Sequence, residues 1–445
     1  MNALKPSFYN YYFKHKGSQY VYNTLSTSVI ELDSDTYNAL KSAKIDSINK
    51  EYIEPLQELK FLVEFNADEQ AEYLYFYNRT RIGTGAKMLS VTFVPSFACN
   101  LACPYCLEGQ AKDPKAATKE DTERLLKFVE NRIVESRIKY EVPISYINAN
   151  LYGGEPMLQK KTFLQYFKGM KNIADKYGCN IHYMIVSNFT LLDDDILDLI
   201  EEYDMMVQVS IDGTKEEHDK RRIYKNGKGS YDVILNNLKK MKERHLEKNV
   251  VIRINIDSES IQSAEKILAD IHEYSKDVYF GILEKFSGFN DCYGDNCIGR
   301  DRITKAARIN HLTELLSDYG YTITPEFGKM SPCAICGENK FHVDPYLNLY
   351  TCELAVNQPK LSVGKIGPNG EFLANNNFYK MMNHTPAKFK KCMDCKLMPM
   401  CATGCSTKAY IRDGKDDGVI DKPFCLHTEE DLLDYLKHYV ETLEE

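Results

Sequence analysis

Three closely spaced cysteines constrain this chain more than any other feature. Cys99, Cys103 and Cys106 form the pattern C-x3-C-x2-C directly after residues 88–94, whose alternation of apolar and polar side chains predicts a strand. A Pro-Ser pair ends that strand and places the cysteines on a loop. Three thiolates on one short loop can hold three irons of a cubane cluster, leaving the fourth iron without a protein ligand. Structural thiols or part of a zinc site are the alternative, although the loop offers no fourth zinc ligand.

The cysteine loop, with the aromatic Tyr105 before its last cysteine, resembles the radical S-adenosylmethionine (SAM) superfamily. The resemblance implies that Cys99, Cys103 and Cys106 hold a 4Fe–4S cluster and act in catalysis. It also implies that SAM chelates the open iron through its amino and carboxylate groups, with Tyr105 in the cofactor site.

Composition excludes several other classes of protein. The chain has 445 residues, enough for two to four domains, and its formal net charge of −8 argues against a nucleic-acid surface. No apolar run approaches the length of a membrane span. Fourteen cysteines without a recognisable signal peptide indicate a reducing cytoplasm, where clustered thiols point to metal rather than disulfides.

Residues 1–84 are predicted to form a small separate domain. Strand patterns at 8–13, 20–23 and 29–32 precede helical patterns. This order resembles the winged-helix element that recognises precursor peptides, which implies that an extended leader peptide binds as an added strand on a sheet edge. A winged helix with only a packing role is the alternative.

Residues 85–325 alternate strands with helices, which predicts the α/β class and a parallel sheet. The expected strands are residues 89–94, 144–152, 181–187, 205–212, 250–256 and 278–283. Six such units predict a partial (β/α)6 barrel, the radical SAM fold by resemblance. Active sites of such sheets gather at the carboxyl ends of the strands, where the suggestive motifs of this chain fall.

The second expected strand ends in Gly153, Gly154 and Glu155, followed by proline. Two glycines let backbone groups approach a ligand closely, and Glu155 adds a carboxylate beside them. The sequence resembles the GGEP motif of the family, which implies that these residues bind the amino group of SAM.

Further cofactor residues are implied at the ends of the next two strands. The third strand ends in Ser187 and Asn188, and the fourth carries S-x-D-G at Ser210, followed by H-D-x-x-R ending in Arg222. By resemblance, all four residues belong to the SAM site, and the guanidinium fork of Arg222 suits the SAM carboxylate.

Four more polar residues in this region have open or structural interpretations. Asp212 is expected either to approach the substrate or to cap the next helix. His218 is interpreted as a structural hydrogen-bonding residue. Arg253 and Asn255 alternate inward with apolar neighbours, and their role is open.

The third predicted domain, residues 326–445, is rich in cysteine. Eight cysteines divide into two sets of four, each enough for a fully ligated cluster. Their spacing resembles the SPASM extension, which carries two auxiliary 4Fe–4S clusters. By resemblance, one set is Cys333, Cys336, Cys352 and Cys405, and the other is Cys392, Cys395, Cys401 and Cys425.

Several points about these cysteines stay open. Leu347 stands where the family usually has a glycine, which questions the local hairpin and leaves open whether Cys333 is a ligand. A zinc ribbon built from the two C-x2-C pairs is the alternative. Cys292 and Cys297 are interpreted as incidental thiols, with a redox or substrate-facing role as the alternative. Residues 431–443 predict an amphipathic helix that packs as a lid on this domain.

Together these resemblances imply a radical SAM/SPASM enzyme that matures a ribosomally made precursor peptide. Reductive cleavage of SAM would give a 5′-deoxyadenosyl radical that abstracts hydrogen from an unactivated carbon. The expected product is an intramolecular cross-link, first of all a thioether from a cysteine sulfur, with C–C or C–O linkage as variants. Implied partners are the precursor peptide with its leader and an external electron donor of flavodoxin or ferredoxin type.

Two other functions are kept as alternatives. One is an anaerobic sulfatase maturase that oxidises cysteine or serine to formylglycine; the N-terminal domain speaks against it, because that class does not need a leader reader. The other is a non-enzymatic iron–sulfur scaffold or redox sensor. In a scaffold or sensor of this kind, the GGEP-like and H-D-x-x-R motifs at the strand ends would have no purpose.

Overall fold

The structure of the chain, a computed structural model, divides into two compact units. It describes residues 3–81, 85–106, 108, 113–139, 143–257, 260–275, 277–283, 312, 314–321, 333, 337–413, 422–425 and 428–443. The larger unit contains residues 85–323 and 338–379, and the smaller combines 1–84, 324–337 and 380–445. Cys292, Cys297 and Cys336 lie outside the described residues.

The larger unit is built on a sheet to which the described residues contribute ten strands. Its parallel part runs in the order β11-β10-β9-β8-β7-β6. These strands are β6 (Met88–Phe93), β7 (Tyr146–Leu151), β8 (Asn180–Ser187), β9 (Met206–Ile211), β10 (Val250–Ile256) and β11 (Asp277–Ile282). Each expected strand between residues 89 and 283 is confirmed, with bounds that shift by one or two residues.

Four further strands that were not predicted continue the same sheet. They are β12 (Lys340–Val343), β13 (Asn348–Tyr350), β14 (Gly364–Ile366) and β15 (Phe372–Ala374). β12 runs parallel to β6, and the others follow antiparallel. Residues 338–379 therefore belong to the same compact unit as the parallel strands. The division into domains at residues 84 and 325 stays a prediction.

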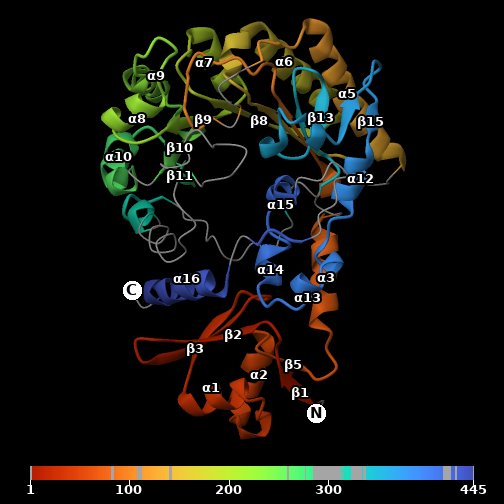
Figure 1. The fold of residues 1–445 in the computed structure, drawn as a ribbon, viewed down its shortest axis with the longest axis vertical. Helices are drawn as coiled ribbons and strands as arrows, with labels where there is room; N and C mark the ends of the chain where they lie inside the picture. The colour runs from red at the N-terminus through yellow and green to blue at the C-terminus, as the bar shows by residue number, and fades with distance from the viewer. Residues whose placement is uncertain are drawn as a thin grey trace. The chain divides into compact units, whose positions relative to one another are not determined.

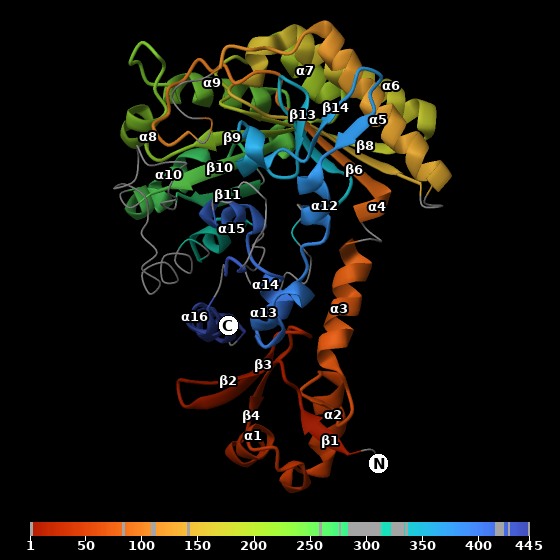
Figure 2. The same cartoon turned by 45° about the vertical axis from the view of Figure 1, so that its right-hand side comes forward.

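Helices cover one face of this sheet (Figures 1 and 2). They are α5 (Lys119–Lys139), α6 (Lys160–Tyr177), α7 (Asp194–Glu202), α8 (Lys215–Arg221), α9 (Tyr231–Glu243) and α10 (Ala264–Ile271). The Tyr166 hydroxyl donates to the Val91 carbonyl at 3.0 Å, and its ring lies 5.4 Å from that of Phe93. Phe128 packs on Phe341 with ring centroids 5.3 Å apart. The apolar side chains of the strands therefore point toward the helices.

The opposite face of the sheet carries many polar side chains, which alternate along the strands with the apolar ones that face the helices. Asn150 donates to Thr92 Oγ1 at 3.3 Å, and the Tyr279 hydroxyl donates to Gln208 Oε1 at 2.6 Å. Further residues of this inner face are Ser210, Arg253, Asn255 and His342. Barrel interiors are usually filled by branched apolar side chains, so these polar side chains are candidates for contact with a polar ligand.

The smaller unit begins with a three-stranded antiparallel sheet in the order β2-β3-β4. Its strands are β2 (Asn10–His15), β3 (Ser18–Asn23) and β4 (Val29–Leu32), followed by α1 (Ser34–Lys41) and α2 (Lys50–Glu58). The predicted order of strands and helices is present. Three further elements were not predicted: β1 (Leu4–Pro6), its antiparallel partner β5 (Leu62–Glu64), and α3 (Glu69–Arg79).

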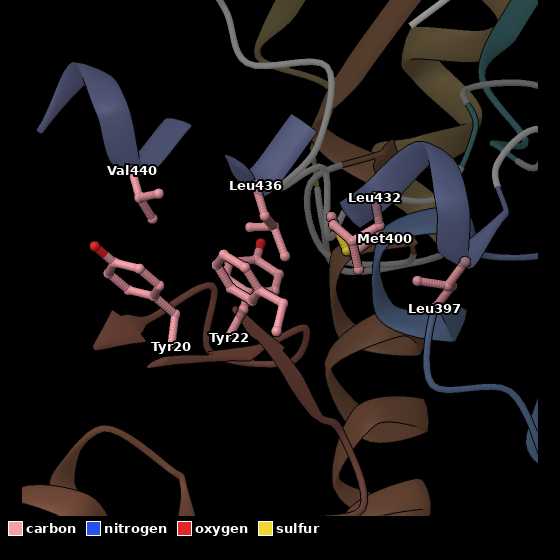
Figure 3. Close-up of a cluster of buried hydrophobic side chains, with 8 residues drawn as sticks. Tyr20, Tyr22, Leu397, Met400, Leu432, Leu436 and Val440 are labelled. Carbon is pink, nitrogen blue, oxygen red and sulfur yellow. The ribbon is translucent and has the colours of Figure 1, made fainter. Parts of the chain in front are cut away.

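The C-terminal helix α16 (Glu429–Thr442) covers one face of this small sheet (Figure 3). Tyr20 and Tyr22 pack there against Leu432, Leu436 and Val440, with further side chains from segment 397–400. The helix begins with a capping box made by Thr428 and Asp431. The predicted helix at 431–443 is thus present, and it packs on the N-terminal strands.

The remaining named α-helices are short; α4 leads into β6, and the others lie in the cysteine-rich part of the chain. They are α4 (Gly85–Lys87), α12 (Asn376–Met382), α13 (Lys390–Met393), α14 (Met398–Cys401) and α15 (Ser406–Asp413). Within the described part of the chain, no helix is long and apolar enough to cross a membrane.

Candidate functional site

The three thiols of the cysteine loop lie close together at the carboxyl end of β6. Cys99 and Cys103 are buried and Cys106 is half-buried. Burial raises the pKa of Cys103 to about 11; nearby Arg222 opposes the rise, while Asp212 and the other two thiols add to it. The thiols are therefore near enough to interact electrostatically, as the spacing of the motif predicts.

The two glycines at the end of β7 let that strand pack directly on the cysteine loop. Gly154 N donates to Ser96 O at 3.2 Å, and Glu155 N donates to Ala98 O at 2.9 Å. A Cβ on Gly154 would lie 2.1 Å from Ala98 O, and one on Gly153 would lie 2.7 Å from Ser96 O. Gly153 also has φ +141°. The close approach that the glycines permit is thus made to the cysteine loop itself.

Glu155 is buried, with 1% of its surface exposed. Its carboxylate accepts hydrogen bonds from Met157 N at 3.0 Å, Ser187 Oγ at 2.9 Å and Asn188 N at 2.7 Å. Burial raises the pKa of Glu155, and these hydrogen bonds oppose the rise. Glu155 and Ser187 therefore tie the ends of β7 and β8 together beside the cysteine loop.

Asn188 connects the end of β8 to the cysteine loop. Its Nδ2 donates to Asn100 Oδ1 at 2.8 Å and lies 3.6 Å from Cys99 Sγ. Its Oδ1 accepts from the backbone and hydroxyl of Thr190. Ser210 is buried on β9, in register with Arg253 of β10, and thus lies deeper on the inner face.

A buried network joins Arg222 to the aromatic residue of the cysteine motif. Arg222 Nη1 donates to the Tyr105 hydroxyl at 2.9 Å and lies 3.6 Å from Asp212 Oδ2. The Tyr105 hydroxyl donates to Asp212, whose other oxygen accepts from Asn255 Nδ2 at 2.8 Å. Asp212 thus contacts the motif residue, a role that neither predicted alternative included. Two sequence features could have pointed to these contacts of Asp212: the S-x-D-G pattern and the inward alternation at Asn255.

The electrostatics of this network favour a permanently charged Arg222. Burial alone would lower its pKa, but Cys103, Asp212, Cys99 and Cys106 together raise the pKa of Arg222 above its usual value. Its buried Nε has no hydrogen-bond partner among the described residues. A charged guanidinium with an unpaired N–H is suited to an additional anionic ligand.

His218 has a structural position, as expected. Its Nδ1 accepts from Asp212 N at 3.2 Å, and its Nε2 lies 3.0 Å from Ser230 Oγ, which donates to Arg222 O at 2.6 Å. Burial, with Arg222 and Arg221, lowers the pKa of His218 well below its usual value. A neutral imidazole therefore holds the backbone of Asp212 and, through Ser230, that of Arg222.

A second group of thiols lies in the smaller unit. Burial, together with the neighbouring thiols of Cys401, Cys425 and Cys395, raises the pKa of Cys392 to about 12. These four are the residues that the resemblance assigns to one auxiliary cluster. In the other set, burial raises the pKa of Cys405, and the nearby Cys333 adds to the rise. Cys352 of that set belongs to the larger unit.

Leu347 adopts the left-handed backbone conformation that glycine reaches most readily. It lies between β12 and β13 with φ +64°, and its backbone N–H donates to Asp344 O at 2.9 Å. A non-glycine residue costs about 1–2 kcal/mol in this left-handed region, and the buried leucine side chain offsets that cost. The hairpin is therefore kept despite the substitution.

The thiols of Cys99, Cys103 and Cys106 and those of the Cys392 set fit iron–sulfur clusters in their chemistry, since in each set the thiols lie near enough to interact. Among the described residues, no three cysteine, histidine or carboxylate side chains are already arranged around a single metal ion. The unpaired Nε of Arg222 and the carboxylate of Glu155 add groups suited to a zwitterionic ligand beside the first set.

Comparisons with known proteins agree with this geometry. A model described as the radical SAM superfamily matches residues 93–271. A cysteine-type anaerobic sulfatase-maturating enzyme of Clostridium novyi (strain NT) is 22% identical over 373 residues, covering 76% of this chain and 94% of that protein.

Two solved structures resemble this chain. Native anSMEcpe with bound AdoMet and Kp18Cys peptide has a TM-score of 0.60 and 19% identity, covering 80% of this chain and 98% of that chain. Streptococcus suis SuiB bound to precursor peptide SuiA has a TM-score of 0.51 and 14% identity, and the match covers 94% of this chain and 99% of that chain. At these identities the likeness shows the fold alone, and it confirms the expected mixed α/β architecture with a large sheet.

Proposed function

We propose that this chain, whose residues 93–271 match the radical SAM model, reductively cleaves SAM and modifies a peptide. The observation that carries the proposal is the convergence of the cysteine loop, Glu155 and Arg222 at the carboxyl ends of the strands. Three thiols, a carboxylate and a guanidinium are together the groups that an iron–sulfur cluster and an amino acid cofactor need.

Each of these residues has a separate binding task. Cys99, Cys103 and Cys106 would hold the 4Fe–4S cluster to which SAM binds. Arg222 would bind the SAM carboxylate through its unpaired Nε, and Glu155 would accept from the SAM amino group. When bound, the cluster and SAM supply a 5′-deoxyadenosyl radical that abstracts hydrogen from a substrate carbon.

The remaining cysteines would hold two auxiliary 4Fe–4S clusters. The interacting thiols of Cys392, Cys395, Cys401 and Cys425 support one set. For the other set, Cys333, Cys336, Cys352 and Cys405, the support is the proximity of Cys405 and Cys333. Either cluster would accept the electron that the substrate radical must lose.

The N-terminal strands would read the leader of a precursor peptide as a winged-helix domain. β4 pairs only with β3 among the described strands and so presents a sheet edge. An extended leader would add there as a further strand, with an entropic cost of ordering. The relatives' structures with bound peptides support a peptide substrate.

Two products are consistent with this site. The N-terminal sheet favours an intramolecular thioether cross-link in a precursor peptide. The similarity to a cysteine-type sulfatase-maturating enzyme over 76% of this chain favours formylglycine formation in a sulfatase. We propose the cross-link first and keep formylglycine formation as the second candidate.

The test is an oxygen-free assay of the reconstituted enzyme with SAM and a chemical reductant. The probes are short cysteine-containing peptides encoded beside the gene and a synthetic cysteine peptide derived from a sulfatase. A cross-link removes two hydrogens and keeps the sulfur, whereas formylglycine replaces the thiol by a carbonyl oxygen, so mass spectrometry separates the products. Absence of 5′-deoxyadenosine and of both products would contradict the proposed function.

A further inference from the structure

His342 of β12 is a buried polar residue that the cofactor site does not use. It is 5% exposed, and neither of its ring nitrogens has a hydrogen-bond partner among the described residues. Buried polar groups are nearly always hydrogen-bonded, because a buried donor or acceptor without a partner is costly. Among the described residues, the imidazole therefore lacks the hydrogen-bond partners that a buried ring requires.

The strand register places His342 on the inner, polar face of the sheet. Phe341 is paired with Val91 and His342 with Thr92 of β6. The Phe341 ring packs on Phe128 of α5, so its side chain points to the helices. His342 follows it directly and points to the opposite face.

Charged groups of the larger unit border the imidazole. Glu353 Oε2 lies 3.8 Å from His342 Nε2, too far for a hydrogen bond, and the Glu353 side chain is 55% exposed. Arg253 of β10 and Lys340 of β12 act on the same Glu353 carboxylate. The ion pair with Glu353 is thus a loose one, and it leaves the hydrogen-bonding capacity of the imidazole unused.

The imidazole is uncharged in this environment. Burial lowers the pKa of His342 to about 4; Glu353 opposes this shift and Lys340 adds to it. At neutral pH one ring nitrogen therefore carries a proton and donates, while the other is bare and accepts.

The inner face connects this position to the cysteine loop. Arg253 Nε donates to Asn255 Oδ1 at 2.9 Å, and Asn255 Nδ2 donates to Asp212, which accepts from Tyr105. Arg253, which acts on the Glu353 carboxylate, is thus linked by hydrogen bonds to Tyr105 of the cofactor site.

We propose that His342 contacts the substrate, by hydrogen-bonding the backbone of a peptide segment on the inner face of the sheet. A peptide backbone offers both a carbonyl acceptor and an N–H donor, the two partners that a neutral imidazole lacks here. This assignment rests on the proposed function, in which the substrate is a peptide.

The experiment compares His342→Phe and His342→Gln with the matched control His272→Gln in the full-length, cluster-loaded enzyme. His272 lies at the exposed end of α10, where its Nδ1 is 2.9 Å from Ala269 O. The probe is whichever of the two kinds of peptide the wild-type enzyme modifies in the assay above. Melting temperature, iron content, and kcat/KM for the peptide are measured for every variant.

The expected result separates binding from stability. His342→Phe removes two buried unpaired polar atoms, so it melts at or above the wild-type temperature with the same iron content, yet loses at least tenfold in kcat/KM. His342→Gln keeps a donor and an acceptor and recovers part of that loss, and His272→Gln behaves as wild type.

Two results would overturn the assignment. One is a His342→Phe enzyme with wild-type kcat/KM. The other is a loss of kcat/KM accompanied by a lower melting temperature or lost iron, which would indicate a structural role. The proposed function is tested with the wild-type enzyme, and it fails if that enzyme modifies no peptide. The assignment of His342 is tested only when the wild-type enzyme is active, so the two failures are distinguishable.

Discussion

At the scale of single residues, Ser187 donates to Glu155 and Arg222 donates to Tyr105, while the binding roles of these residues stay predictions. The motifs placed Glu155, Ser187 and Arg222 together, and their contacts follow that placement. The Asp212 link to Tyr105 was not predictable, because sequence spacing does not tell which of two inward side chains meets a residue on another loop. Leu347 shows the converse: a tolerated left-handed leucine is indistinguishable in sequence from a lost glycine.

His218 provides a pH-dependent test at this scale. In the unfolded chain His218 has the usual imidazole pKa of 6.5, whereas in the folded protein its pKa is well below that value. Falling pH therefore favours unfolding through this residue. We expect His218→Asn to lower the free energy of unfolding by about 1–3 kcal/mol near neutral pH, because buried hydrogen bonds are lost. The difference in stability between the variant and the wild type should become smaller toward about pH 5.5, where the wild type itself is destabilised.

The measurement is urea unfolding of both proteins across this pH range at constant ionic strength, followed by circular dichroism. The exposed His272→Asn variant serves as a control for changes in histidine number. A stability gap that stays constant with pH would contradict the neutral, structural role of His218.

At the scale of elements, long periodic segments were predictable and short ones were not. The strands from β6 to β11 span six residues or more and alternate with helices, so their pattern is visible. β12 to β15 have three or four residues each and lie among turns and cysteines, which is too short for any periodicity. Their addition to the sheet is what brings His342 beside the inner face.

Gly154 tests the packing of β7 on the cysteine loop. In Gly154→Ala the new Cβ would lie 2.1 Å from Ala98 O, so the loop must move. We expect formation of 5′-deoxyadenosine to fall about a hundredfold or more, since misplacing a reacting group by about 1 Å has that effect.

The matched control is Gly178→Ala at the C-terminal end of α6, where a Cβ would meet nothing within 4 Å. Its φ of +62° makes alanine cost about 1–2 kcal/mol of stability, without effect on the cysteine loop. Equal 5′-deoxyadenosine formation by the two variants would show that Gly154 is not needed for loop packing.

At the scale of the whole molecule, the sequence could not predict which segments share a core. Tyr20 and Tyr22 lie some four hundred residues before Leu432 and Leu436, yet they pack together (Figure 3). Periodicity marks a buried face but not its partner. Removing the N-terminal strands would therefore also uncover α16, so substitutions are a sharper test than truncation.

Leu436→Ala tests this shared core. Leu436 is fully buried, and truncating such a side chain costs about 2–5 kcal/mol. The control Leu443→Ala affects a residue of the same type that is 59% exposed, and should change stability by no more than about 0.5 kcal/mol. Urea unfolding followed by circular dichroism compares the two, and equal stabilities would contradict a core that includes α16.

The central claim is that three sets of thiols hold iron–sulfur clusters, one of which binds SAM. The most direct test is the iron and sulfide content of protein purified and reconstituted without oxygen, with zinc measured alongside. We expect about twelve irons per chain, falling by about four in a variant with Cys99, Cys103 and Cys106 changed to alanine. Zinc with no iron would contradict the account.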